Sequence, residues 1–356
     1  MEGVANATRR GRTRGVGAIG VALLSLLLSG CAFPRLPFGG PEPLLETVVE
    51  GSGSAKILIL DVDGVLTEGE ETSAFGLVSH ESQVARIREQ LDAAREDARV
   101  VAVVLRIDSP GGTAAASDLI YHEIARFKEK KKVPVLAQLM GVAASGGYYV
   151  AMSADAIYAQ PTTVTGSIGV IFEGVNVSGL MEKLGIADQT LKSGALKDAG
   201  SPLRPMTQAE RAQLQSVIDL LYARFCDVVA AGRPKLGAER VHELADGRVY
   251  AAPQALDAGL IDGISYLPDA IDEARQRAGV DRARVIVYRR SSEWAENIYS
   301  RAPIGAGPRA AAPAVPDSLR LDLGLDLRPP LSGPAFLYLW WPGLGEVPVG
   351  ARGRTG

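Results

Sequence analysis

This chain of 356 residues has few cysteines, few histidines and little net charge. Its two cysteines, Cys31 and Cys226, lack companions at the spacing of a metal site or a disulfide framework, which excludes a cysteine-built zinc site. Three histidines offer little choice of a general base, and each is read as a surface or satisfied residue. The formal net charge of -3 leaves no broad cationic surface to neutralise a phosphate backbone, so nucleic acid is not an expected partner.

The composition is otherwise that of a globular protein. Hydrophobic residues make up 47% of the chain and charged residues 22%, which excludes a fibrous or wholly disordered chain. We expect one globular domain over residues 54–301. Residues 302–356 form a tail rich in proline and glycine that carries the aromatic cluster Phe336-Leu337-Tyr338-Leu339-Trp340-Trp341. This cluster is expected to dock on its own domain, although a partner or a bilayer surface would also suit it.

The first 53 residues have the features of an export signal followed by a tether. Four arginines precede the apolar run 16–28, which is too short to span about 30 Å of hydrocarbon, although residues 15–33 could just do so. Leu28-Ser29-Gly30-Cys31 is similar to a bacterial lipobox, in which cleavage before the cysteine frees it to carry lipid. We expect a signal peptide at 1–30, a lipid on Cys31 and a flexible tether at 31–53, which would anchor an exported protein to the outer side of a membrane. An uncleaved membrane anchor is the alternative.

The middle of the chain alternates short β-branched runs with longer helical periods, which predicts an α/β fold around a mainly parallel sheet. The expected strands are 56–66, 100–107 and 133–140, and the expected helices are 82–97, 114–130, 146–153 and 208–231. Glycine-bearing loops follow two of these strands, at 108–112 and 141–147. Ligands gather at the carboxyl ends of parallel strands, so the two loops should lie close together and form a site.

Ser145 stands in the second of these loops, just before the glycines that open a helix. A hydroxyl at that point is well placed to attack a carbonyl, and free amides of the helix start can hold the resulting oxyanion. Gly111 and Gly112 offer further amides, because a residue without Cβ lets the backbone approach a ligand closely. Ser-Gly-Gly is also common in plain turns, so this pattern alone leaves both interpretations open.

Lys197 is the candidate base for such a serine. A buried lysine can lose its proton, with a pKa lowered from about 10.4 toward 7 or 8, whereas arginine stays charged. Lys192 lies five residues earlier in the same segment and is the competing choice. A solvated loop lysine is the structural alternative for either residue.

Five motifs follow one another in the chain: Val103-Val104-Leu105-Arg106-Ile107-Asp108-Ser109-Pro110-Gly111-Gly112, Ala143-Ala144-Ser145-Gly146-Gly147-Tyr148-Tyr149, Thr165-Gly166-Ser167-Ile168-Gly169-Val170, the segment 192–202, and Ala245-Asp246-Gly247-Arg248-Val249-Tyr250. In this order they make residues 56–290 resemble the signal peptide peptidase A family. The resemblance implies a serine protease with a fold like that of Clp protease and crotonase, built of repeated ββα-type units. A single protease unit resembles the short members of that family, whereas the lipobox and the aromatic tail depart from its pattern.

The resemblance also implies roles for individual residues. Ser145 would be the nucleophile, Lys197 the base, and the Ser167 hydroxyl would hold the lysine amine. Gly112 and Gly146 would supply the oxyanion amides, with neighbouring Gly111 beside them. No metal or cofactor is implied. Relatives form closed rings in which a serine of one protomer can meet a lysine of the next, and they are thought to degrade apolar signal peptides left in the membrane after cleavage.

Two other functions, a phosphatase and a binding module without catalysis, are also compatible with parts of the sequence. The run 57–67 is similar to the first motif of haloacid dehalogenase phosphatases, in which Asp61 and Asp63 would attack phosphorus and move a proton with the help of magnesium. That chemistry needs a later acidic pair, which the region around Asp262 does not supply. The third hypothesis is a binding module that keeps the fold without catalysis.

Overall fold

The structure is a computed structural model that describes residues 42–69, 71–72, 79–291, 293–301 and 336–340. The predicted signal peptide, the lipobox cysteine Cys31 and most of the predicted tether lie outside these residues. Within the described ranges, no helix combines the length and the apolar character that crossing a bilayer requires.

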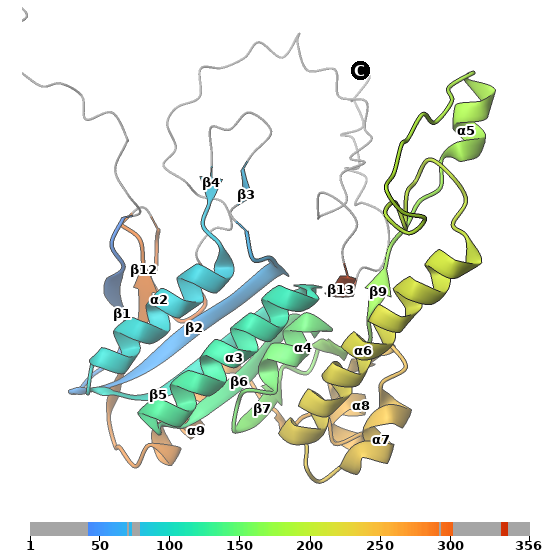
Figure 1. The fold of residues 1–356 in the computed structure, drawn as a ribbon. Helices are drawn as coiled ribbons and strands as arrows, with labels where there is room; N and C mark the ends of the chain where they lie inside the picture. The colour runs from blue at the N-terminus through green and yellow to red at the C-terminus, as the bar shows by residue number, and fades with distance from the viewer. Residues whose placement is uncertain (1–41, 70, 73–78, 292, 302–335, 341–356) are drawn as a thin grey trace, which may run out of the picture. The chain divides into compact units, whose positions relative to one another are not determined.

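A mainly parallel sheet lies at the centre of the domain (Figure 1). Its strands are β1 (Leu45–Gly51), β2 (Ala55–Leu66), β5 (Val100–Thr113), β6 (Val135–Ala144), β7 (Ala156–Ala159), β8 (Val164–Gly166), β9 (Ile171–Phe172), β10 (Val249–Ala251), β11 (Gly263–Ile264), β12 (Ala283–Arg289) and β13 (Phe336–Leu339). The main path runs β1-β12-β2-β5-β6-β7-β11 and is parallel from β12 to β11. A separate pair joins β3 (Glu71–Thr72) and β4 (Ser79–His80).

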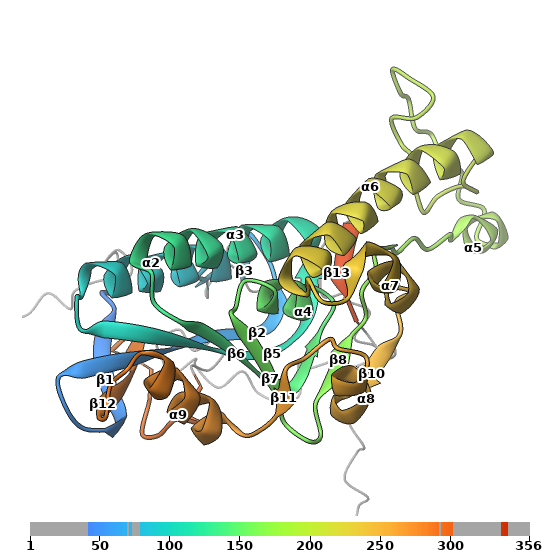
Figure 2. The same cartoon turned by 90° about the horizontal axis from the view of Figure 1, so that it is seen from below.

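Helices cover both faces of the sheet (Figure 2). They are α2 (Gln83–Glu96), α3 (Ala114–Lys131), α4 (Gly146–Ala151), α5 (Ser178–Lys183), α6 (Gln208–Gly232), α7 (Gly237–Leu244), α8 (Ala252–Asp257) and α9 (Leu267–Arg277). Helices α2 and α3 lie side by side on one face, and α9 lies on the other. The described residues therefore have the predicted α/β architecture with a mainly parallel sheet, which confirms the fold class.

Strand β2 shows why this sheet needs two helical layers. Side chains alternate between the faces of a strand, and Leu58 and Leu60 join the core under α2 and α3, whereas Ile57 and Ile59 join the core under α9. All four side chains are at most 1% exposed. A continuous apolar run such as this one is typical of a parallel strand that is buried on both faces.

The helix starts follow the local sequence. Ser82 accepts a hydrogen bond from the amide of Ala85 at the start of α2, and the Thr113 hydroxyl accepts one from Ala116 at the start of α3. These side chains satisfy amides that have no partner inside the helix. The predicted helix 82–97 and helix 114–130 are thus found within two residues of their expected bounds.

Three segments differ from the sequence-based expectation. Residues 45–51, expected to belong to the tether, form β1 and pair antiparallel with β12, and Val49 of this strand packs against the core under α9. Strands β5 and β6 continue through the glycine-bearing segments that were expected to be loops, so 108–112 and 141–144 belong to the sheet and pair with neighbouring strands. The site is consequently built on strand ends rather than on free loops.

Candidate active site

Ser145 occupies the turn between β6 and α4. Its amide donates to the Gly166 carbonyl at 2.7 Å, and its side chain makes no hydrogen bond to the other described residues. Helix α4 is held firmly behind it, because Tyr148 is fully buried and its hydroxyl donates to the Leu260 carbonyl at 2.7 Å. The backbone of Ser145 is therefore held in position, and its hydroxyl is left without a competing partner in this part of the chain.

Backbone strain sets Ser145 and Ser167 apart. Among the described residues other than glycine, only three have a positive φ: Lys132, Ser145 at 52° and Ser167 at 49°. Lys132 is the left-handed cap at the end of α3, a position where such an angle is common. The two serines have no such reason, and strained backbone of this kind gathers at functional sites, where the surrounding structure holds it.

Glycines form the floor beside Ser145. Gly111 has a φ of +99°, and a Cβ built on it would lie 2.6 Å from the Gly146 amide nitrogen. A Cβ built on Gly146 would lie 2.3 Å from the Ser117 hydroxyl oxygen, so no side chain fits at either position. The structure thus brings the two predicted glycine segments together next to the serine, as the carboxyl ends of neighbouring parallel strands require.

A cavity of about 300 Å³ opens above Ser145. This volume is at the lower end of the range for small-molecule and peptide subsites. Ser145 and Ser167 both line it, although they are 1% and 8% exposed as whole residues. The other lining residues are Gly169, Val170, Ile171, Tyr222, Ala245, Asp246, Gly247 and Leu339.

The titratable groups that line the cavity are poor bases near neutral pH. The Arg248 side chain hydrogen-bonds to Asp246 and lowers the pKa of that carboxyl to about 2. Burial raises the pKa of Tyr222 to about 12. The carboxylate is thus too weak a base and the phenol keeps its proton, so neither group is suited to take a proton from a serine hydroxyl near neutral pH.

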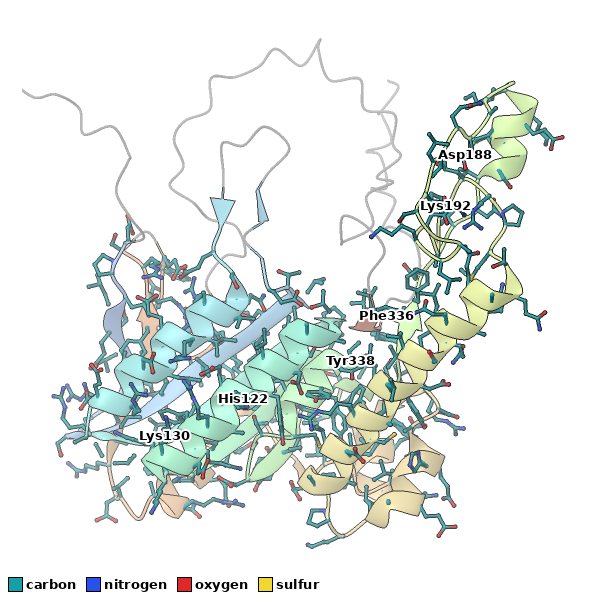
Figure 3. The ribbon with its side chains drawn as sticks, viewed as in Figure 1. His122, Lys130, Asp188, Lys192, Phe336 and Tyr338 are labelled. Carbon is teal, nitrogen blue, oxygen red and sulfur yellow. The ribbon has the colours of Figure 1, made fainter. Side chains whose placement is uncertain are left out.

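Lys197 does not line this cavity within the single chain. It lies in the segment that links α5 to α6, its side chain is exposed, and it forms no ion pair or side-chain hydrogen bond with the other described residues. Lys192 of the same segment, visible in Figure 3, forms an ion pair with Asp198 at 2.7 Å. Ser145, Ser167 and the glycines are thus brought together, and Lys197 is not.

The two histidines whose side chains the structure describes lie outside the site. His122 is exposed on α3 (Figure 3), and His242 is exposed on α7, with its ring centroid 6.0 Å from that of Tyr222. Neither residue lines the cavity. The side chain of the third histidine is not described.

Asp61 is engaged in a structural network, not in a phosphatase site. Its two carboxylate oxygens accept hydrogen bonds from Arg106 and Arg289, each at 2.6 Å. Both guanidinium groups are buried, at 0% and 2% exposure. Among the residues that the structure covers, no group of three His, Cys, Asp or Glu side chains is placed to hold a metal ion.

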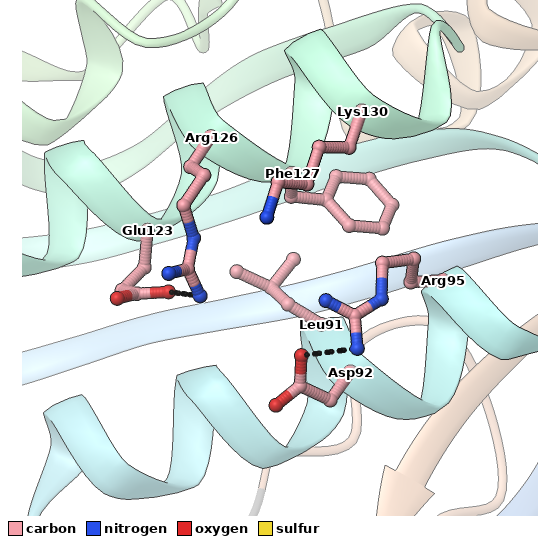
Figure 4. A pocket seen from close by; sticks show the side chains of 7 residues that line it. All are labelled: Leu91, Asp92, Arg95, Glu123, Arg126, Phe127 and Lys130. Carbon is pink, nitrogen blue, oxygen red and sulfur yellow. Dashed lines mark hydrogen bonds and ion pairs between the residues drawn. The ribbon is translucent and has the colours of Figure 1, made fainter.

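A second hollow lies between α2 and α3 (Figure 4). Ion pairs between Glu123 and Arg126 and between Asp92 and Arg95 line its rim. Its volume is about 10 Å³, which is room for one water molecule at most. This hollow cannot hold a substrate, so the cavity at Ser145 is the candidate active site.

Sequence reasoning missed part of the cavity wall. Leu339 belongs to the tail strand β13, which pairs with β5 and β9 beside Ser145. The aromatic cluster was a visible signal of a docking segment, but the sequence carried no indication of where it docks. Tyr222 was likewise hidden in the apolar pattern of a long helix.

Known proteins resemble this chain over most of its described length. The model for Peptidase family S49 matches residues 127–281. A protein of Enterococcus faecium that carries the name signal peptide peptidase SppA is 40% identical over 268 residues, which cover 74% of this chain and 77% of that protein. Protease 4 of Haemophilus influenzae is 33% identical over 67% of this chain and 37% of its own length. The solved structure of a membrane-bound stomatin-specific protease is 15% identical, covers 62% of this chain and 86% of that one, and has a TM-score of 0.38.

The similarity to the Enterococcus faecium protein is spread over about three quarters of both chains, which is too extensive for a shared local motif. The family match falls on the part of the chain that contains Ser145 and Ser167. The chain belongs to peptidase family S49, the signal peptide peptidase A family, and is a serine-type peptidase with the Clp protease/crotonase-like fold of that family.

Proposed function

We propose that this peptidase hydrolyses extended apolar peptides at a membrane, cleaved signal peptides above all, with Ser145 as its nucleophile. The observation that carries the proposal is the meeting of two strained serines, Ser145 and Ser167, in one cavity whose floor is made of glycines. The name of the Enterococcus faecium relative supports the choice of substrate. The strands β5 and β9 beside the cavity already pair with an extended segment of this chain, and such edges suit a peptide that binds in extended form.

Lys197 of a neighbouring copy is proposed as the general base. The cavity contains no group that accepts a proton near neutral pH, and Lys197 is a lysine without a partner among the described residues. The segment around it exposes large apolar side chains, with Leu191 at 97%, Val175 at 72% and Leu184 at 65%. Single apolar side chains are common on surfaces, and three such exposed side chains in one segment support a contact surface there.

The occupant proposed for this surface is a second copy of the chain, in a ring-shaped homo-oligomer. Packing against the neighbour would bury the apolar side chains and carry Lys197 out of solvent to the next cavity. Burial would then lower the pKa of the amine and favour its neutral form. Assembly is therefore a condition of activity in this proposal.

The chemistry proceeds through an acyl-enzyme. Neutral Lys197 takes the proton from the Ser145 hydroxyl as the oxygen attacks the peptide carbonyl carbon. The amides of Gly112 and Gly146 hold the oxyanion, while the Ser167 hydroxyl orients the lysine amine. The lysine ammonium gives its proton to the departing amine as the peptide bond breaks. A water molecule, deprotonated by the same amine, then attacks the ester carbonyl. As the ester C–O bond breaks, the lysine ammonium returns the proton to the Ser145 oxygen and the acid product leaves.

An N-terminal lipid on Cys31 is proposed to hold the enzyme at the extracytoplasmic face of a membrane. The support is the lipobox-like run 28–31 and the substrate class, since apolar signal peptides remain in the bilayer after cleavage. Mass analysis of the native N-terminus decides this point. A diacylglyceryl cysteine at position 31 is expected, and an intact chain starting at residue 1 would contradict it.

The catalytic proposal is tested with a quenched fluorescent apolar peptide and the full-length protein. Ser145→Ala and Lys197→Ala should each lower the cleavage rate by a factor of 10³ or more, since the two residues act as a unit. Lys192→Ala is the matched control and should retain activity, because its amine is already paired with Asp198. Cleavage that survives Ser145→Ala would remove the mechanism, and the rate should not depend on magnesium or a chelator.

A further inference from the structure

Ser109 lies on β5 just before the glycines of the candidate active site, and it does not line the cavity. The residue is fully buried, at 0% exposure. Its hydroxyl donates to the Gly64 carbonyl at 2.5 Å and accepts a hydrogen bond from the Gly111 amide at 3.1 Å. One side chain thus joins β2 to the glycine segment of β5. A buried hydroxyl of this kind is costly to remove, because both of its partners then lose a hydrogen bond.

A β-bulge explains how this hydroxyl reaches both partners. The pairing of β2 with β5 shifts register next to Gly64, so that this one residue faces two residues of β5, Ser109 and Pro110. Gly64 has a φ of +65°. The extra residue of a bulge re-aims the strand that carries it, and bulges are frequent beside active sites. The run 57–67, which is similar to a phosphatase motif, therefore supplies a backbone carbonyl to Ser109.

Gly111 connects Ser109 to the two proposed oxyanion amides. It is covalently joined to Gly112, and a Cβ built on Gly146 would lie 3.1 Å from the Gly111 Cα, so the two glycine segments are in contact. The Gly111 amide itself donates to Ser109, so it is not free to bind an oxyanion. A shift of Gly111 would therefore change the separation between the amides of Gly112 and Gly146.

The backbone of Ser109 also packs against the helix that follows Ser145. A Cβ built on Gly147 would lie 2.6 Å from the Ser109 carbonyl oxygen, so α4 and β5 approach each other closely at this point. The approach is possible because residue 147 has no side chain. Ser109 therefore contacts both parts of the proposed oxyanion hole, the strand that carries Gly112 and the helix that begins at Gly146.

We propose that Ser109 is a positioning residue for the oxyanion hole. Its hydroxyl, oriented by the Gly64 carbonyl, holds the Gly111 amide. This contact keeps the amides of Gly112 and Gly146 directed at one point, where the oxyanion forms. The inference rests on the proposed function, because that proposal names these two amides as the donors. Oxyanion donors act on charge that develops only in the transition state, so Ser109 contributes to kcat and not to the binding of substrate.

The variant Ser109→Ala in the full-length protein tests this role. It should lower kcat on the apolar reporter peptide by about 10–100-fold, less than the cost of removing a donor outright, and leave KM within about twofold. Ser153→Ala is the matched control, because this serine is also buried, at 2% exposure, and its hydroxyl donates to the Val150 carbonyl at 2.7 Å. Ser153 does not line the cavity, so its kcat should stay within about twofold of the wild type.

A peptide aldehyde gives a readout that a general loss of stability would not change. It adds to Ser145 as a hemiacetal whose oxygen occupies the oxyanion hole, so its inhibition constant should rise by about the same 10–100-fold. Binding of the uncleaved peptide is measured by anisotropy in the Ser145→Ala background, with and without Ser109→Ala. The two dissociation constants should agree within about twofold, because the ground state makes little use of the oxyanion hole.

A second variant keeps the test readable. Ser109→Cys retains a side chain of similar size with a weaker donor and acceptor, so its kcat should lie between those of the wild type and Ser109→Ala. An unchanged kcat in Ser109→Ala, or in Ser109→Cys if the alanine variant does not fold, would overturn the inference. A loss confined to KM, or an unchanged inhibition constant of the aldehyde, would also overturn it. These outcomes differ from failure of the catalytic proposal, which would show as cleavage that survives Ser145→Ala.

Discussion

Replacing Asp61 by asparagine gives a sharp test of whether the run 57–67 is structural or catalytic. Asp61 is the shared partner of two buried guanidinium groups, those of Arg106 and Arg289. Arg106 also donates to the carbonyls of Ile298 and Ser300, which ties the segment 298–300 to the sheet. Asp61→Asn keeps the size of the side chain but leaves two buried cations without a countercharge.

The expected cost follows from that burial. Breaking a buried ion pair by removing one partner costs about 3–5 kcal/mol. For a domain of 150–250 residues, each kcal/mol shifts Tm by about 2–4 °C, so Asp61→Asn should lower Tm by roughly 6–20 °C. Asp92→Asn is the matched control, because its pair with Arg88 is exposed at 37% and 43% and should contribute less than about 0.5 kcal/mol.

The assay combines thermal unfolding with peptidase activity. Tm is measured by circular dichroism, and the rate per folded molecule is measured at 15 °C, where the variant is still folded. The rate should match the wild type, because Asp61 does not line the cavity at Ser145. A variant that loses peptidase activity while its Tm is unchanged would refute the reasoning, since Asp61 would then act in the chemistry.

Three further predictions concern the site, its surroundings and its solvent. Gly111→Ala should lower kcat by about 10²–10³-fold, which is the usual cost of disturbing an oxyanion hole. Gly169 lines the same cavity, but a Cβ added there would have its nearest neighbour at 3.5 Å, so Gly169→Ala should stay within a few-fold of the wild type. Equal rates of the two variants in steady-state assays would count against the glycine floor. Burial and the negative charge of Asp61 raise the pKa of Asp63 to about 7 from 3.8. Between about pH 4 and pH 7 the folded state therefore holds a proton that the unfolded chain has released, so the free energy of unfolding should fall as the pH rises through this range. Asp63→Asn should remove that slope in a pH series of Tm values. Lys197→Arg should be as inactive as Lys197→Ala at every pH up to 9, because a guanidinium keeps its proton; restored cleavage would show that the residue acts through its charge.

The sequence predicted the fold well where local and long-range signals agree. Strand β2 is apolar on both faces, and helix α3 has a threonine cap and a cationic end, so both were found close to their expected bounds. The glycine segments were harder. Gly111 and Gly112 were expected in a loop because of their conformational freedom, but they pair with β2 and β13 as part of strand β5, which only the tertiary structure decides.

The candidate site was predictable in its residues and less so in its geometry. Ser145, Ser167 and the glycines are close in space because strand order brings them to one edge, and their motifs were visible in the sequence. The position of the tail could not be foreseen, since nothing local specifies that Tyr338 stacks on Tyr149. Lys197 stays a prediction, because the single chain does not bring it to the cavity.

Mixed assembly of two inactive variants tests the shared dyad most directly. Chains with Ser145→Ala and chains with Lys197→Ala are co-expressed in equal amounts under different tags, and particles that carry both tags are isolated. Random assembly places an intact serine next to a neighbour's intact lysine at one site in four, so roughly 25% of wild-type peptidase activity should return. Particles that contain both chains and remain as inactive as either variant alone would contradict a site completed by Lys197 of the neighbouring copy.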